Sequence, residues 1–289
     1  MFAGRCFRSE KLSISLQEHA LQTADPMTAK TPLPKLTIAE KDRIYSFKSE
    51  QSWGITDPGR FHQIMDEARG LVAAGSYLGD NLFTWMRNLS IFEDSAFRRS
   101  WQSNVTSSAD EAIAWRRYIL CCAACHCVQM EGDFVECGVL NGTGVKTVID
   151  YFGKDAFAKQ FWAYDTFDTN PVEGHAFIGQ EAGLFEKVGA RFSGYANVRL
   201  VRGLLPESLS GNSPERIAYL HIDLNKAEFE IAVLERLFDR VVPGGIVVLD
   251  DYEWSGVYRD QKIAEDAWLA ARNYRVFPLP TGQGLVLKR

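Results

Sequence analysis

The sequence lacks any long uninterrupted apolar run. No stretch of the 289 residues approaches the roughly 20 consecutive apolar residues that a helix needs to span a bilayer. The first 30 residues also lack the apolar central block of a secretory signal. We therefore expect a cytoplasmic protein that has no membrane partner.

Positive charge is also scarce. The chain carries 32 Lys and Arg against 37 Asp and Glu, a net charge of -5, and its basic residues form no tract. Proteins that bind nucleic acid hold the phosphate backbone with clustered Lys and Arg. Nucleic acid is therefore a poor candidate for the substrate, and the 46% apolar and 24% charged residues fit an ordinary globular domain.

Cysteines are present, but not in the spacing of a disulfide framework. Four of the six lie in one short segment, as Cys121, Cys122, Cys125 and Cys127, together with His126. A zinc site is a poor alternative, because on a helix Cys127 would point away from the other thiols and no second ligand pair follows. We expect reduced thiols that pack a helix against a sheet.

The chain divides into three parts by composition. Residues 1–45 are polar, contain three prolines and show no sustained period, which predicts a flexible leader within which Met27 is an alternative start. Residues 46–108 carry apolar side chains at helical spacing, first over 61–72 and again over 82–92, which predicts a helical cap. Residues 109–289 form the third part.

The third part begins with a helix and continues as an alternation of strands and helices. The helix is expected from Ala109 to Met130, with Ser107 and Ser108 as candidate N-caps. The expected strands are Phe134–Cys137, Phe161–Asp165, Val198–Val201, Ala218–Asp223 and Ile246–Asp250. The expected helices between and after them are Thr143–Phe152, Glu181–Phe192, Ala227–Val241 and Asp260–Asn273. Such alternation is typical of a parallel sheet covered on both faces.

The chain ends on a predicted hairpin, with strands at Arg275–Leu279 and Leu285–Leu287 around a turn at Thr281–Gly284. Five parallel strands with helices, followed by an antiparallel pair, resemble the sheet of class I methyltransferases. The fold class expected is therefore α/β, a Rossmann-like methyltransferase sheet with an N-terminal extension.

A glycine-rich segment from Glu136 to Gly144 follows the first of these strands and opens a helix. Its three glycines allow a tight turn and a close approach of the backbone to a ligand, beside the free amides of a helix N-terminus. The second strand ends at Asp165, whose carboxylate could accept hydrogen bonds from a ribose. The simpler interpretation is that the glycines serve only the turn and that Asp165 caps the strand end.

Two features favour S-adenosylmethionine over a dinucleotide as the cofactor. Glu136 lies inside the glycine motif, where its charge would repel a pyrophosphate but suits a cofactor that carries no phosphate. The terminal hairpin is also more typical of methyltransferases than of dehydrogenases. An oxidoreductase that binds an NAD-type cofactor on the same fold remains the alternative.

Acidic residues end the fourth and fifth strands, as Asp223 and the pair Asp250 and Asp251. Ligands bind at this edge of open α/β sheets. Three converging carboxylates repel one another unless a cation or a proton offsets them, and oxygen ligands suit Mg²⁺. The sequence therefore predicts a divalent metal site on Asp223, Asp250 and Asp251. The alternative is that Asp223 contacts a substrate or cofactor while the pair only caps a loop.

These motifs together resemble the macrocin O-methyltransferase family. The resemblance rests on Asp133-Phe-Val-Glu-Cys-Gly-Val-Leu-Asn-Gly-Thr, on Tyr164-Asp-Thr-Phe, on Ile222-Asp, on Pro243-Gly-Gly and on Asp250-Asp-Tyr, and it covers about residues 132–287. Members methylate sugar hydroxyls in antibiotic biosynthesis with S-adenosylmethionine and Mg²⁺. The resemblance thus implies an O-methyltransferase that acts on a small hydroxylated molecule.

Site residues follow by position. The resemblance implies that Asp223, Asp250 and Asp251 bind the metal, and Glu228 also matches a family glutamate. The residues expected at the cofactor site are Glu136, Gly138, Asn141, Gly142, Thr143, Asp165, Thr166 and Gly203. Asp223, Asn225 and Asp251 are the expected catalytic residues.

One departure from the family pattern affects the mechanism. The family has Asp-x-Asp at the end of the fourth strand, where the second aspartate is a proposed base, whereas this chain has Asp223-Leu-Asn225. An amide cannot accept a proton at neutral pH. The replacement bases considered are His175, Glu173 and Glu253, and a catalytically silent relative that binds S-adenosylmethionine is the alternative.

A tryptophan and a histidine also lie near the acidic strand ends in the sequence. Trp254 follows the acidic pair closely enough to form a wall of the acceptor pocket, although a core position is the simpler interpretation. His221 shares a side of its strand with Asp223, but is expected to be a satisfied core residue. The acceptor and the oligomeric state, a homo-oligomer among the alternatives, are not determined by the sequence.

Overall fold

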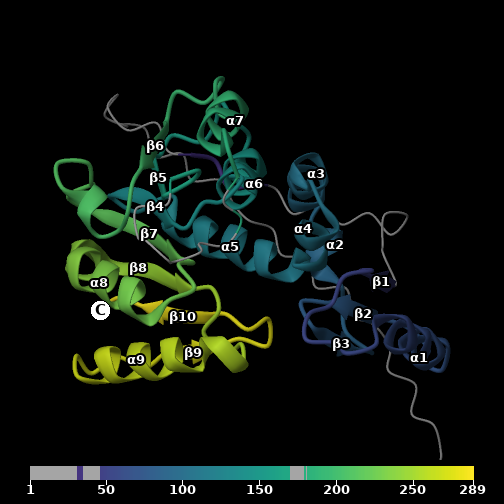
Figure 1. Ribbon diagram of the computed structural model, residues 1–289. Coiled ribbons are helices and arrows are strands. Elements are labelled where there is room, and N and C mark those ends of the chain that lie inside the picture. The colour runs from purple at the N-terminus through teal and green to yellow at the C-terminus, as the bar shows by residue number, and fades with distance from the viewer. Residues whose placement is uncertain (1–30, 35–45, 170–178, 180) are drawn as a thin grey trace, which may run out of the picture.

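The computed structural model describes residues 31–34, 46–169, 179 and 181–289 (Figure 1). Within these ranges no helix has the length and apolarity to cross a bilayer. The predicted leader lies almost wholly outside the described residues, as do Glu173 and His175. The described chain forms a large sheet with helices on its faces, and a small sheet with its own helix lies to one side (Figure 1).

The large sheet has seven strands in the order β6-β5-β4-β7-β8-β10-β9. Its strands are β4 (Asp133–Cys137), β5 (Phe161–Asp165), β6 (Val198–Arg202), β7 (Ile217–Ile222), β8 (Val241–Leu249), β9 (Phe277–Pro278) and β10 (Gly284–Leu287). The strands β6, β5, β4, β7 and β8 pair in parallel, while β10 pairs antiparallel with both β8 and β9. The predicted Rossmann-like sheet with a terminal hairpin is therefore confirmed.

Helices cover both faces of this sheet, so the central strands β4, β5, β7 and β8 are largely buried. The helices are α5 (Ala114–Cys127), α6 (Thr143–Phe152), α7 (Leu184–Arg191), α8 (Ala227–Leu237) and α9 (Arg259–Ala270), with short 3₁₀ turns at Glu207–Leu209, Phe238–Arg240 and Gly256–Tyr258. Phe134 and Tyr219 belong to the core that includes α5 and α6, whereas Val135 and Leu220 belong to the core that includes α8. This alternation follows from the period of two along a strand.

Three of the four thiols of α5 lie in or against the first of these cores, and Cys122 is exposed. Cys121 and Cys127 are buried, Cys125 packs against the core, and all described cysteines are free thiols. The sequence-based interpretation of this segment as a packing helix is therefore confirmed for its buried members.

The N-terminal part is not the helical cap that the sequence predicted. Helix α1 (Pro58–Gly70) is confirmed, but the second predicted helix over 82–92 is wrong. A small sheet of β1 (Ser46–Lys48), β2 (Ser76–Gly79) and β3 (Leu82–Thr84) occupies this part, and helices α2 (Ser90–Glu93) and α3 (Ser95–Asn104) follow it. Asp80 and Asn81, both at positive φ, form a two-residue turn that reverses the chain, as hairpins require.

The predicted helix from Ala109 to Met130 is interrupted at Ile113. Ser107 caps α4 (Ser108–Ala112) by accepting a hydrogen bond from the backbone N–H of Asp110, as predicted. Ile113, with φ of -111° and ψ of 36°, then changes the direction of the chain before α5. Its side chain offers no cap, so the N-terminus of α5 requires another partner.

That partner is Asp80, from the turn between β2 and β3. Its carboxylate accepts hydrogen bonds from the backbone N–H groups of Trp115 and Arg116, each at 3.0 Å, and from the hydroxyl of Tyr77. Asp80 is buried, and burial raises its pKa to about 6. The small sheet therefore supplies the N-cap of α5, and in doing so fixes the backbone at Arg116.

We predict that Asp80→Ala lowers the free energy of unfolding by about 1–3 kcal/mol, because it leaves buried N–H groups and a buried hydroxyl without their acceptor. Urea unfolding followed by circular dichroism measures the change. Asp66→Ala, which breaks an exposed ion pair with Lys48 on the same small sheet, is the matched control. Equal unfolding midpoints for the two variants would contradict the capping role.

Candidate active site

A cavity of about 300 Å³ opens at the carboxyl ends of the central strands. The predicted site residues that line it are Gly138, Asn141, Asp165, Asp223, Asn225, Asp250 and Asp251. The glycine-rich loop after β4 and the acidic ends of β7 and β8 therefore face one space. The convergence expected from strand topology is present in the structure.

Gly138 allows the glycine-rich loop to contact the end of β7. Its φ is +94°, and a Cβ at this position would overlap the carbonyl oxygen of Asp223. The backbone N–H of Asp223 donates to the carbonyl of Cys137 at 2.8 Å, which fixes the two strand ends side by side. Any residue with a side chain at position 138 would separate the glycine-rich loop from the acidic cluster.

Asp165 holds the glycine-rich loop in place. Its Oδ2 accepts hydrogen bonds from the backbone N–H groups of Val139 and Leu140, both at 2.8 Å, and its Oδ1 accepts one from Phe167 at 2.6 Å. The carboxylate also lines the cavity. Because each carboxylate oxygen has two acceptor positions, Asp165 can shape the loop and still accept a hydrogen bond from a ligand.

Five predicted cofactor residues do not line the cavity. They are Glu136, Gly142, Thr143, Thr166 and Gly203. Gly142, with φ of +80°, starts α6, and a Cβ there would lie 2.6 Å from the ring of Phe192. Gly203 donates its N–H to the carbonyl of Asp165 at 3.0 Å. At least these two glycines shape the backbone around the site.

His221 bridges two buried carboxylates. Its Nδ1 lies 3.0 Å from Oε2 of Glu136, and its Nε2 lies 3.3 Å from Oδ1 of Asp250. Burial alone would lower the pKa of His221, but Glu136 and Asp250 outweigh it and raise the pKa to about 10. The ring is fully buried, so His221 is a core residue, as the simpler interpretation expected; its Nε2 has a hydrogen-bond partner in Asp250, whereas its Nδ1 makes only the ion-pair contact with Glu136.

Arg116 reaches the acidic cluster from α5. Its Nη1 donates to Oδ2 of Asp250 at 2.8 Å, and its Nη2 donates both to Oδ1 of Asp251 at 3.0 Å and to the carbonyl of Asp250 at 2.9 Å. Its Nε donates to the carbonyl of Thr281 at 3.3 Å. Arg116 is 5% exposed. Burial opposes ionisation of Asp250, but Arg116 and His221 hold its pKa well below the usual range.

The arrangement does not fit the Mg²⁺ site predicted on Asp223, Asp250 and Asp251. Both carboxylate oxygens of Asp250 already accept hydrogen bonds, Oδ2 from Arg116 and Oδ1 from His221 and from Gln283 at 2.7 Å. Oδ1 of Asp251 is bound by Arg116 as well. Among the described residues, no three His, Cys, Asp or Glu side chains are placed to hold a metal ion.

Asn225 supports Asp223 instead of adding a second carboxylate. Its Nδ2 donates to Oδ1 of Asp223 at 3.0 Å, and its φ of +61° places it in the left-handed region that asparagine tolerates. Burial, together with the charges of Asp250 and Asp251, raises the pKa of Asp223 well above its usual value. Asp223 is thus a carboxylate that readily takes up a proton.

An aromatic wall closes one side of the cavity. Trp254 lines it, which favours the pocket wall over the core position that was the simpler interpretation, and Trp53 and Tyr258 line it as well. The rings of Trp53 and Trp254 meet edge to face with centroids 5.6 Å apart. Sequence reasoning missed Trp53, because it comes from the segment between β1 and α1 and no spacing relates it to Trp254.

Glu253, the one predicted replacement base among the described residues, lies outside the cavity. It is exposed and pairs with Lys262 at 2.8 Å. Glu228, which matches a family glutamate, is exposed. Within the described residues, the cavity therefore offers Asp110, Asp165, Asp223, Asp250 and Asp251 as its carboxylates.

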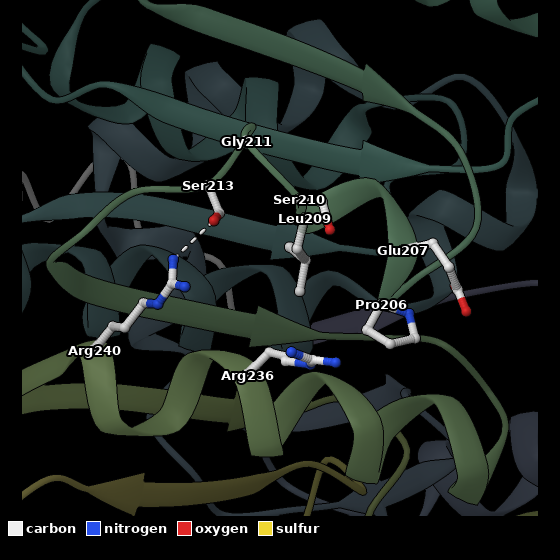
Figure 2. Close-up of a pocket in the computed structure, with 8 residues that line it drawn as sticks. All are labelled: Pro206, Glu207, Leu209, Ser210, Gly211, Ser213, Arg236 and Arg240. Atoms are coloured by element: carbon white, nitrogen blue, oxygen red, sulfur yellow. Dashed lines mark hydrogen bonds between the residues drawn. The ribbon is translucent and has the colours of Figure 1, made fainter.

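A second cavity of about 310 Å³ lies beside α8, near the loop after β6 (Figure 2). Arg240, in the 3₁₀ turn Phe238–Arg240, donates to the hydroxyl of Ser213 at 2.8 Å in this cavity, and Arg236 on α8 also lines it (Figure 2). None of the predicted site residues lines it. The chemistry expected of this chain therefore belongs to the first cavity.

A family model described as Macrocin-O-methyltransferase (TylF) matches residues 117–273, more than half of the chain. The chain belongs to the macrocin O-methyltransferase family. Both acidic strand ends and the glycine-rich loop of the cavity lie within the matched range. Arg116 and Trp53 precede it.

One curated relative matches part of this chain. A curated protein of Streptomyces olivaceus, 8-demethyl-8-(2,3-dimethoxy-alpha-L-rhamnosyl)-tetracenomycin-C 4'-O-methyltransferase, is 31% identical over 142 residues, which cover 43% of this chain and 54% of that protein. The match thus spans about half of that relative.

Two solved structures are also similar to this member of the macrocin O-methyltransferase family. The O-methyltransferase NovP is 21% identical, with a TM-score of 0.49, over 60% of this chain and 79% of its own. CalS11, the calicheamicin methyltransferase, is 19% identical, with a TM-score of 0.47, over 68% of this chain and 92% of its own.

Behind the Asn225 turn, a buried pair of carboxyl groups supports the site. Glu230 on α8 accepts hydrogen bonds from the backbone N–H groups of Leu224 and Asn225 at 3.0 and 3.3 Å. Glu265 on α9 interacts with it, and both side chains are fully buried. Burial raises the pKa of both groups, that of Glu265 to about 7. At least one of the two therefore carries a proton at moderately acidic pH.

We predict that Glu265→Gln reduces the pH dependence of stability. The folded pKa of Glu265, about 7, lies above its ordinary value of 4.5. Its contribution to stability is therefore fully present below about pH 4.5 and is lost as the pH rises through about 7. Urea unfolding at about pH 5 and about pH 8 should show that the free energy of unfolding of the variant increases relative to that of the wild type as the pH rises. Glu235→Gln, an exposed position on α8, is the control, and identical behaviour of both variants would refute the raised pKa of Glu265.

Proposed function

We propose that this protein is an S-adenosylmethionine-dependent O-methyltransferase whose acceptor is a sugar hydroxyl on a small molecule. The observation that carries the proposal is the single cavity shared by the glycine-rich loop of β4 and the carboxylates that end β7 and β8. Membership of the macrocin O-methyltransferase family supports the reaction. The relative from Streptomyces olivaceus, whose name describes a methyltransferase acting on a rhamnosyl compound, supports the substrate class.

The cavity has the features that S-adenosylmethionine requires. When bound, this cofactor supplies a methyl group on a positively charged sulfur. The backbone from Gly138 to Asn141 would lie along it, since position 138 has no side chain to block the approach. Asp165 would accept hydrogen bonds from its ribose, with the acceptor capacity that the loop amides leave. Asn141 adds a polar side chain on the same wall.

The acceptor hydroxyl would be placed beside Asp223. Methyl transfer is an in-line displacement, so the enzyme must hold the hydroxyl oxygen roughly 3 Å from the methyl carbon. Asn225 binds one oxygen of the Asp223 carboxylate and fixes its orientation. We assign Asp223 as the group that accepts the hydroxyl proton, with Asn225 as its positioning residue. Asp251, held by Arg116, would help to orient the acceptor.

The aromatic wall explains why the acceptor would be a sugar. A sugar ring has apolar C–H faces and polar hydroxyl edges. Trp254 and Trp53 offer apolar ring surface on one side of the cavity, and Asp223, Asn225 and Asp251 offer hydrogen-bonding groups on another. Pockets that combine apolar walls with a few polar groups orient their ligands in this way.

We predict that Asp223→Asn lowers kcat by about 10²–10⁴-fold, the range for the loss of a general base, while the purified protein still binds S-adenosylmethionine. Transfer of a labelled methyl group to a panel of rhamnosyl and other deoxysugar compounds, with simple phenols for comparison, measures the rate. Asp239→Asn, at an exposed residue that pairs with Lys288, should retain the wild-type rate.

Calorimetry with S-adenosylmethionine and with NAD completes this experiment. Binding of NAD without binding of S-adenosylmethionine would overturn the proposal in favour of a dinucleotide enzyme. Binding of S-adenosylmethionine without transfer to any sugar or phenol would identify the chain as a catalytically silent relative.

We further predict that Trp254→Ala raises the KM for the sugar acceptor by about 10-fold or more, since large aromatic contacts dominate binding energies, and leaves the Kd for S-adenosylmethionine unchanged. Trp254→Phe, which keeps an aromatic face, should recover most of the affinity. Steady-state kinetics with the preferred acceptor and calorimetry with the cofactor separate the two effects. Equal losses of acceptor and cofactor affinity would place Trp254 in a structural role.

A further inference from the structure

Arg116 contacts two of the three carboxylates that the sequence predicted as ligands of a divalent cation. Its guanidinium lies between Asp250 and Asp251, at 2.8 and 3.0 Å from their carboxylate oxygens. We propose that Arg116 is a built-in cation that replaces the metal ion of the family, so that this chain assembles its acceptor site without a divalent metal. The inference deepens the proposed function and rests on it for its catalytic part only.

Two cations of the chain offset negative charge in the cluster without a metal. Asp250 and Asp251 share the guanidinium of Arg116, and Asp250 also contacts the charged ring of His221. Asn225 is neutral where the family pattern has a second aspartate, which lowers the negative charge of the cluster by one unit. The need for a divalent ion is reduced accordingly.

The guanidinium is fixed from several sides, so a metal ion could not displace it at little cost. Its Nε donates to the carbonyl of Thr281, and it stacks over Trp254 at 5.1 Å from the ring centroid. Gly282 lets this indole lie close to the chain, since a Cβ there would overlap the ring. The backbone N–H of Arg116 is held by Asp80. Displacement would leave a buried cation without partners, which proteins avoid.

Arg116 is accordingly a positioning residue. It lies in contact with the carboxylates of Asp250 and Asp251 and acts on the acceptor through them. A planar guanidinium binds two carboxylates at fixed angles, whereas the ammonium of a lysine is a single flexible point of charge. The shape of the acceptor site therefore depends on the guanidinium as well as on its charge.

The wild-type protein provides the first test, and it does not depend on activity. We expect no binding of Mn²⁺ by electron paramagnetic resonance and no rise in Tm with added Mg²⁺, because both oxygens of Asp250 and Oδ1 of Asp251 are already engaged. Methyl transfer should be unchanged by a chelator. Stoichiometric Mn²⁺ binding by the wild type would overturn the inference whether or not methyl transfer is detected, so its failure is separate from that of the proposed function.

Arg116→Ala provides the second test. Removal of the guanidinium exposes Asp250 and Asp251 beside Asp223, and we expect this variant to bind Mn²⁺ with a Kd of about 1 mM or tighter, as carboxylate sites do. Added Mg²⁺ should raise its Tm and restore part of the lost methyl transfer. A folded Arg116→Ala protein with no affinity for Mn²⁺ would overturn the inference.

Two further variants control for charge and folding. Arg117→Ala removes an equal charge from the next residue of α5, which has no ion pair with Asp250 or Asp251, and it should not create a Mn²⁺ site. Arg116→Lys keeps the charge, so it should bind no Mn²⁺ while its KM for the acceptor rises. Mn²⁺ binding by Arg117→Ala equal to that of Arg116→Ala would overturn the inference. If Arg116→Ala does not fold, the wild-type and Arg116→Lys measurements decide.

Discussion

The contact of Arg116 with Asp250 and Asp251 joins three parts of the molecule that are far apart in sequence. Arg116 belongs to α5, the carboxylates follow β8, and the carbonyl of Thr281, which receives Nε, lies in the turn of the terminal hairpin. Oppositely charged groups in a buried position require each other, because either alone would be an uncompensated charge away from water. The geometry of the cavity therefore depends on all three parts being folded together, and the site cannot form from the central strands alone.

Much of the fold could be predicted from the sequence because the pattern that reveals it is local. The bounds of β5 and α6 match the prediction, since each consists of apolar residues in a period that burial on the sheet enforces. The error over 82–92 has the same origin. Apolar residues recur there at helical spacing, but the turn at Asp80 and Asn81 pairs Leu82–Thr84 with β2, and this tertiary pairing overrides the local pattern.

The candidate site was predictable to the extent that strand topology determines it. Asp223 and Asp250 follow adjacent parallel strands, so they must lie at one edge of the sheet, next to the glycine-rich loop. Arg116 could not be found in this way, because 134 residues separate it from Asp250 and its approach depends on the break at Ile113. A metal was the partner expected for three carboxylates, whereas in the structure Arg116 contacts two of them, Asp250 and Asp251.

The turn between β2 and β3 connects Trp53, a residue of the proposed acceptor wall, with Arg116. Asn81 binds the backbone of Trp53 through two hydrogen bonds, at 2.9 and 3.0 Å, while the adjacent Asp80 caps the helix that carries Arg116. Recombining the N-terminal segments of relatives to change the acceptor would therefore also disturb the contact of Arg116 with Asp250 and Asp251. A chimera joined between the small sheet and α5 would combine the N-terminus of α5 with a capping turn from another protein. An exchange that keeps the site intact therefore has to transfer the turn at Asp80 and Asn81 together with Arg116.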